Sequence, residues 1–194
     1  TTPIRVGQGF TLKGSGSESL TQNYTFTGKP NNGTIATNTV ASDQLMLTGN
    51  PYPSALNATA FINDNLGSID GSLYFWEHYA TNNTHILRDY QGGYAVRNLT
   101  GGVAPTSEGI DYISGLGNPL RGIPNRYIPV GQGFFVNGLI GGGGTVVFNN
   151  GQRGFYKEDD AVNSNVIYKT SGTNKKQKTT ANNNYDPIVT DNYM

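Results

Sequence analysis

The chain has 194 residues and a formal net charge of zero, and only 13% of its residues are charged, against about 25% in a typical globular domain. A neutral chain has no long-range field to attract nucleic acid or an anionic membrane, and the lack of cysteine excludes disulfides, thiolate metal sites and cysteine nucleophiles. Gly, Asn, Thr and Tyr suit tight turns and pleated strands, so we expect an all-β fold, a β-sandwich of jelly-roll type with one short helix.

Short strand-like runs separated by Gly, Pro and Asn follow one another along the chain. One helix is expected among them, over Ala55–Asn65, because Ser54 is a suitable N-cap and Asn65-Leu66-Gly67 is a suitable end. Turn residues are dense from Gly101 to Asn125, which predicts a long surface loop. No apolar run approaches the roughly 20 residues of a membrane-spanning helix, so no membrane insertion is expected. The expected strands are Ile4–Leu12, Tyr24–Phe26, Gln44–Leu47, Leu73–Tyr79, Ile86–Tyr90, Tyr94–Arg97, Tyr127–Val136 and Thr145–Phe148.

The sequence VGQGF occurs twice, at Val6–Phe10 and Val130–Phe134, and a Gly-rich turn, a Phe and an Asn-Asn-Gly segment follow each copy. We interpret the two copies as equivalent corners of two related β-modules, the first entered partway through. The predicted division is residues 1–48, the end of a first β-module or N-terminal strands, and residues 49–156, the main sandwich. Residues 157–194 are polar and rich in clustered charge, which favours a linker or the start of a further truncated module.

The carboxylates and histidines do not form a recognisable catalytic or metal-binding pattern. Among the candidate carboxylates only Glu77 lies in a strong strand, and nothing in the sequence brings it a partner, so we expect no enzyme. His78 and His85 lack further ligands at zinc spacing. Asp64 and Asp70 offer the hard oxygen atoms that calcium prefers, but not at EF-hand spacing, so turns closed by Asp side chains are favoured and no cofactor is expected. The other carboxylates considered are Asp89, Glu108 and Asp111.

The strand Leu73–Tyr79 predicts the candidate binding residues. Because side chains alternate along a strand, Tyr74, Trp76 and His78 share one face, which Tyr90 and Tyr94 from later strands extend into a flat aromatic ladder. Sugar rings stack on such surfaces, so polysaccharide is a candidate partner. The alternative is that both faces are buried and that Trp76 is a core residue, as a lone Trp in a β-sandwich usually is. The opposite face carries Leu73, Phe75, Glu77 and Tyr79.

Several motifs together give the chain a resemblance to a known class of protein regions. Over roughly Val6 to Tyr156 the chain resembles the β-rich region that precedes the C-terminal sorting domain in Bacteroidetes proteins exported by the type IX secretion system. The resemblance implies an extracellular or cell-surface location, contact with the secretion machinery during export, and a piece of a longer, processed protein. The motifs are GNPYPSALNATAFINDN, GSLYFWEHY, GGYAVRN, YIPVGQGFFVNG and GTVVFNNGQR.

Three functions remain open at this point. The first is a non-catalytic structural or adhesive β-module of a secreted surface protein, which contacts neighbouring modules or copies of itself through strand edges or loops. The second is a carbohydrate-binding module that uses the exposed aromatic strand face. The third is an accessory domain of a secreted hydrolase, which predicts that this chain alone is inert.

Overall fold

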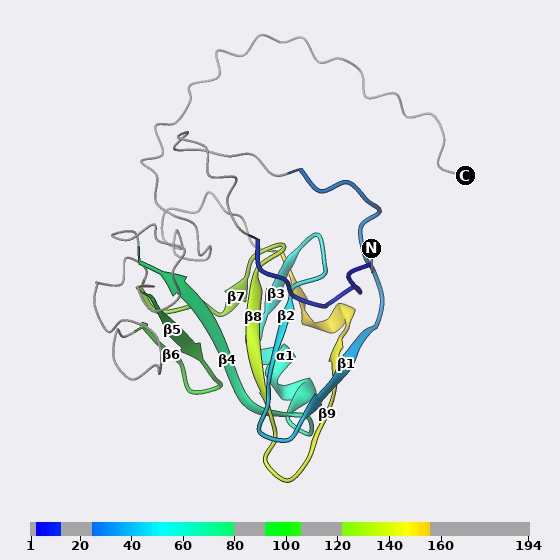
Figure 1. Cartoon of the computed structure of the whole chain (residues 1–194). Coiled ribbons are helices and arrows are strands. Elements are labelled where there is room, and N and C mark those ends of the chain that lie inside the picture. Colours follow the sequence, from blue (N-terminus) through cyan, green and yellow to red (C-terminus); the bar gives the residue numbers. More distant parts are fainter. Residues whose placement is uncertain (1–2, 13–24, 80–91, 106–121, 156–194) are drawn as a thin grey trace, which may run out of the picture.

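The computed structural model describes residues 3–12, 25–79, 92–105 and 122–155 (Figure 1). In these ranges ten strands, all paired antiparallel, form three sheets, with one α-helix and one short 3-10 helix. The expectation of an all-β fold with one short helix is therefore confirmed. The predicted strand Ile86–Tyr90 and the predicted segment 157–194 lie outside the described residues.

The three sheets differ in size and hold strands from distant parts of the sequence. The largest has the order β2-β8-β4-β5-β6, the second has the order β10-β3-β7, and the third is the pair β1-β9. The bounds are β1 Ile35–Ala41, β2 Leu45–Gly49, β3 Ala55–Asn57, α1 Ala58–Asn65, β4 Ile69–His78, β5 Gly92–Arg97, β6 Gly102–Val103, β7 Tyr127–Ile128, β8 Gly133–Gly138, β9 Gly143–Phe148, η2 Asn150–Gln152 and β10 Arg153–Gly154.

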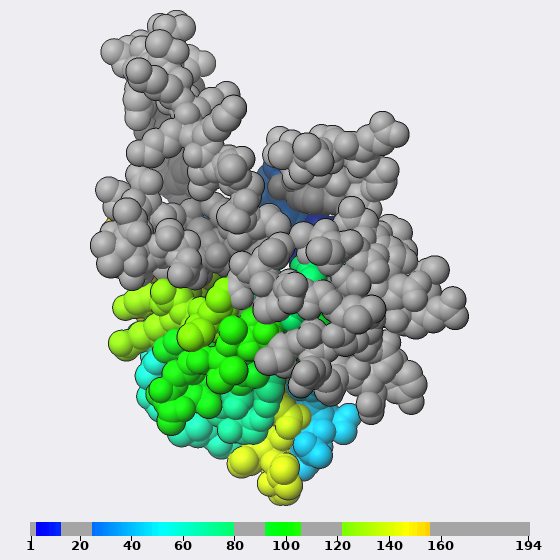
Figure 2. Space-filling model, turned by 90° about the vertical axis from the view of Figure 1, so that its left-hand side faces the viewer, coloured from blue at the N-terminus to red at the C-terminus, as the bar shows by residue number. Residues whose placement is uncertain are grey.

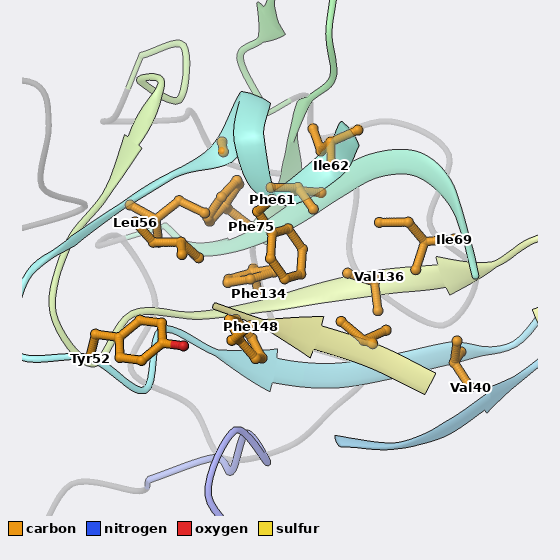
Figure 3. Packing of buried hydrophobic residues seen from close by; sticks show 14 of the residues in the cluster. Val40, Tyr52, Leu56, Phe61, Ile62, Ile69, Phe75, Phe134, Val136 and Phe148 are labelled. Carbon is orange, nitrogen blue, oxygen red and sulfur yellow. The ribbon is translucent and has the colours of Figure 1, made fainter. Parts of the chain in front are cut away.

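The core lies between the five-stranded sheet and the β1-β9 pair, and α1 fills the space between them. The Phe61 ring of α1 lies 5.5 Å from Phe134 of β8 and 4.9 Å from Phe148 of β9, as centroid distances (Figure 3). Phe75 of β4 completes the cluster, 5.7 Å from Phe134. Burial of four phenylalanines across both layers stabilises the sandwich, at roughly 1.5–3 kcal/mol for each side chain.

Helix α1 begins three residues later than its sequence predicts. Asn57 is the N-cap, and its Oδ1 accepts hydrogen bonds from the amides of Thr59 and Ala60, at 3.1 and 3.3 Å. The prediction that Ser54 caps the helix is wrong because Ala55–Asn57 form strand β3, which pairs with β7 and β10. The Ser54 hydroxyl instead accepts a bond from Arg153 Nε, at 3.0 Å.

Three further predictions about elements are corrected by the structure. Residues 3–12 contain no strand, and only an isolated bridge joins Gln8 to Thr48 of β2. The predicted strand Tyr127–Val136 is two strands, β7 and β8, since a turn closed by the bond from the Gln132 amide to the Pro129 carbonyl interrupts it. The predicted loop from residue 101 contains the short strand β6, and β1 was not predicted at all.

The two repeat copies form the same turn. In the first, the Gln8 amide donates to the Arg5 carbonyl and Gly7 has φ +80°; in the second, Gln132 donates to Pro129 and Gly131 has φ +70°. Positive φ at the third turn residue is the mark of a type II turn, which glycine adopts without strain. Both copies border strand β2, and strands on either side of the predicted boundary between residues 48 and 49 share one core.

Candidate functional site

Strand β4 has one buried face and one accessible face. Leu73, Phe75, Glu77 and Tyr79 are all buried, at 3% exposure or less. On the opposite face Tyr74 and Trp76 are half-buried and His78 is exposed. The predicted alternation is thus confirmed, and Trp76 is not a core residue.

Strand pairing extends the accessible face of β4 into a continuous apolar row, which we call the outer row. Residues directly opposite each other in antiparallel strands share a face of the sheet. Tyr74 lies opposite Phe135 of β8 and Val96 of β5, Phe135 lies opposite Leu47 of β2, and Val96 lies opposite Val103 of β6. The outer row therefore crosses the whole five-stranded sheet, which ends with β5 and β6, and these two strands (green) face the viewer in Figure 2.

Trp76 and Tyr94 form an aromatic pair beside the outer row. They lie opposite each other on β4 and β5, with ring centroids 5.0 Å apart and planes at 64°. Tyr94 also meets Phe135, at 5.7 Å and 88°. Because neighbouring rings stand edge to face, the surface is ridged and not the flat ladder that the sequence suggested.

Gly92 lets the Trp76 ring lie against strand β5. A Cβ atom at Gly92 would be 2.4 Å from Trp76 Cζ2 and 2.6 Å from the Glu77 carbonyl oxygen. Both distances are far below van der Waals contact, so only glycine leaves room for the ring in this position. The sequence GGYAVR of β5 thus supplies both the space for Trp76 and its partner Tyr94.

A depression of about 420 Å³ opens on this face of the sheet. Polar groups stand around its aromatic wall. Asn137 Nδ2 donates to Asp43 Oδ1 at 3.2 Å, and the Tyr74 hydroxyl donates to Asp70 Oδ2 at 2.9 Å. A mixture of rings, hydroxyl, amide and carboxylate groups is able to bind a ligand with both C–H faces and hydroxyls. The depression is lined by Asp43, Leu45, Tyr74, Tyr94 and Asn137.

The two tyrosines of the depression keep their hydroxyl protons at neutral pH. Burial raises the pKa of Tyr94 above its usual value, and burial together with the hydrogen bond to Asp70 raises the pKa of Tyr74. Both side chains therefore present neutral phenols that donate and accept hydrogen bonds.

The remaining candidate residues are spread over the molecule. Glu77 is 2% exposed and points to the core side of β4, away from the depression. Burial and the nearby Glu77 carboxylate raise the pKa of Tyr79 on the same side. Tyr90, His85 and the carboxylates Asp89, Glu108 and Asp111 lie outside the described residues.

The acidic side chains considered for calcium have structural partners. Asp70 Oδ1 accepts from the Ser72 amide at 2.8 Å, which is the turn expected from the sequence. Asp64 Oδ2 accepts from Asn149 Nδ2 at 2.8 Å and from Gln152 Nε2 at 2.9 Å, so it ties α1 to η2. Within the four described ranges, His, Asp and Glu side chains nowhere gather in groups of three or more.

Sequence reasoning missed the part of the site that comes from β2 and β8. The run GFFVNG of β8 alternates, with Phe134 and Val136 buried and Phe135 and Asn137 on the outer face. That alternation was a signal for Phe135. The contribution of Leu45 and Leu47 follows only from the pairing of β2 with β8, which the sequence does not specify.

Comparisons with known proteins connect the chain to one family. The model of a domain of unknown function, DUF8693, matches residues 1–185. No curated protein and no solved structure matches the chain. In the part of the chain that the structure describes, no helix has the length and apolar character needed to cross a membrane.

Proposed function

We propose that this chain is a non-catalytic adhesive β-module of a secreted bacterial surface protein. It binds polysaccharide through the outer face of its five-stranded sheet. The chain belongs to the DUF8693 family of domains of unknown function. The observation that carries the proposal is the set of half-buried rings of Tyr74, Trp76 and Tyr94 beside the depression. The resemblance of the motifs to regions of exported proteins supports the cell-surface location. The burial of Glu77 on the core side supports a non-catalytic role.

The chemistry of the depression fits a glycan chain. The C–H faces of a sugar ring stack on tyrosine and tryptophan, while its hydroxyls bond to Asn137, Asp43 and the Tyr74 phenol. A volume of about 420 Å³ lies in the usual range of ligand sites. Because the rings stand edge to face, the surface suits a single soluble chain and not the flat face of a crystalline polysaccharide.

The single tryptophan makes a direct binding test available. Trp76 is the only Trp of the chain, so its fluorescence reports on this face alone. We expect a member of a panel of soluble neutral polysaccharides to change the emission, and crystalline cellulose to retain little protein in a pull-down. Tyr94→Ala keeps the reporter but removes a stacking ring, and should weaken binding about tenfold, the equivalent of about 1.4 kcal/mol.

Phe155→Ala is the matched control, because Phe155 is an aromatic residue 95% exposed and absent from the depression. It should bind as tightly as the unmodified chain. The proposal fails if no polysaccharide of the panel binds, or if Tyr94→Ala binds as tightly as Phe155→Ala.

A further inference from the structure

A second feature of the molecule is a groove between two strand edges, which borders the aromatic face at Leu45 and Leu47 of β2. Strands β1 and β2 follow each other in the chain, but β1 pairs with β9 and β2 pairs with β8. Figure 1 shows the two strands separating from their common turn. A cavity of about 460 Å³ lies between them. It is lined by residues 36–41 of β1, by residues 44–47 of the turn and β2, and by the N-terminal residues 5–9. An open strand edge is a template for a further strand.

The first VGQGF copy occupies one end of this groove. Gln8 bridges Thr48 of β2, and the Gly9 amide donates to the Leu47 carbonyl at 3.1 Å. On the other side of the groove, Arg5 Nη1 donates to Asn38 Oδ1 of β1 at 2.9 Å. Residues 5–9 therefore touch both edges, although they pair with only a short part of β2.

The second VGQGF copy displays a longer antiparallel pairing with the same strand, in a register shifted by two residues: Gln8 lies opposite Thr48, where the second copy has Phe134. After the same turn, its residues 133–137 pair with all five residues of β2, Gly49 back to Leu45, on the opposite edge. The first copy stops pairing after Gly9. Phe10 and Leu12 remain 49% and 54% exposed, and the Phe10 ring turns toward Phe26, 6.2 Å away.

We propose that the groove between β1 and β2 is a strand-acceptor site and that a second copy of this chain fills it with its residues 5–12. The same residue pairs then form between copies as within one copy, and the register of Gln8 with Thr48 continues to Thr11 with Leu45. Exchange of an identical segment is a low-cost route to assembly because each lost contact is replaced by its equivalent. Donor and acceptor are different surfaces, so repeated exchange gives a head-to-tail polymer.

The hold of the segment on its own copy is weak enough for exchange. Among the described residues, the hydrogen bonds that tie the segment to β1 and β2 are the bridge at Gln8, the bond from the Gly9 amide to Leu47, the Arg5–Asn38 bond and the bond from the Thr48 hydroxyl to the Gly7 carbonyl. Few contacts and exposed apolar side chains mark a segment that opens at low free-energy cost. This inference does not rest on polysaccharide binding and stands or fails separately from it.

The absence of cysteine allows a clean cross-linking test on the full chain. A Thr11→Cys variant is mixed with a Leu45→Cys variant and oxidised, since these positions face each other only in the extended pairing. We expect a disulfide-linked heterodimer at twice the 20.8 kDa mass of the chain, in excess over either homodimer. The control mixture contains Thr145→Cys in place of Leu45→Cys. Thr145 is an exposed residue of β9 that does not line the groove, so this mixture should give no excess of heterodimer.

Two more measurements separate pairing between copies from pairing within a single chain, and show whether the unmodified chain assembles without any cysteine substitution. The double variant Thr11→Cys/Leu45→Cys should form intermolecular disulfides; closure within single chains at every concentration overturns the proposal. Light scattering of the unmodified chain should give a mass that rises with concentration, and a constant monomer mass also overturns it. Thr11→Pro, which lacks the backbone N–H of a position that pairs only between copies, should reduce the rise, whereas Gly28→Ala, whose Cβ would meet nothing within 4 Å, should not.

Discussion

Substitution of Gly92 by alanine is the sharpest test of how the fold builds the aromatic face. The new Cβ would lie 2.4 Å from Trp76 Cζ2 and 2.6 Å from the carbonyl oxygen of Glu77. Carbon atoms in van der Waals contact are about 3.5–4.0 Å apart, so the Trp76 ring has to move by more than about 1 Å. The Glu77 carbonyl is part of the β4 backbone and cannot turn away, so the strands also have to shift.

The expected loss of stability follows from two opposing effects. Overpacking of this kind costs about 1–3 kcal/mol, while replacing glycine by alanine gains about 0.4–1 kcal/mol by reducing the freedom of the unfolded chain. We therefore expect Gly92→Ala to lower the free energy of unfolding by about 1–2 kcal/mol, which corresponds to a fall in Tm of about 2–8 °C for a chain of this size.

The assay combines urea unfolding with the fluorescence of the single tryptophan. Gly92→Ala should shift the Trp76 emission and increase its quenching by acrylamide in the folded protein. Gly133→Ala is the matched control, because it is a strand glycine of the same sheet whose Cβ would meet Thr48 and Leu47 atoms at 3.6–3.8 Å, an ordinary contact. Equal stability and equal emission of the two variants would refute the reasoning.

The remaining predictions concern a buried amide and the tyrosines. Asn65 donates to the Phe61 and Val147 carbonyls and accepts from the Val147 amide, so Asn65→Ala should lower the free energy of unfolding by about 3 kcal/mol in urea. Asn137→Ala, which removes the surface hydrogen bond to Asp43, should lower it by under about 1 kcal/mol, and similar values for both variants would contradict this reasoning. Burial raises the tyrosine pKa values above 10.0 in the folded state, so the stability they contribute is present below pH 10 and is lost as the pH rises further. Tyr94→Phe should consequently lose less stability than the unmodified chain between about pH 9 and pH 11, measured by urea unfolding at each pH, and an unchanged loss would count against the burial of that phenol. The tyrosines with raised pKa are Tyr52, Tyr74, Tyr79 and Tyr94.

Strand β4 illustrates which part of the fold could be predicted from the sequence. The run LYFWEHY alternates without interruption, and period-two alternation is a local property that needs no knowledge of the partners. It correctly placed Tyr74 and Trp76 on one face and Phe75 on the other. The outer row could not be predicted in full, because Leu47 and Val103 join it through strand pairing between distant segments.

The helix start could not be predicted for a related reason. Both Ser54 and Asn57 are good N-caps by residue type, and local preference does not decide between them. Tertiary pairing determines where the helix begins, since Ala55–Asn57 pair with β7 on one side and β10 on the other. Pairing on both edges outweighs the helical preference of the alanine at position 55.

The two VGQGF copies show which features of structure depend on local sequence and which depend on distant pairing partners. Both VGQGF copies form the same turn, because positive φ at Gly7 and Gly131 is a local preference of the third residue. Only the second copy continues as a full strand, since β8 lies between β2 and β4 and has a hydrogen-bonding partner on each edge. The first copy has β2 on one edge, while β1 on the other side is held away by its pairing with β9. An equivalent sequence thus becomes a strand where two partners meet it, and leaves an open groove where one partner is missing.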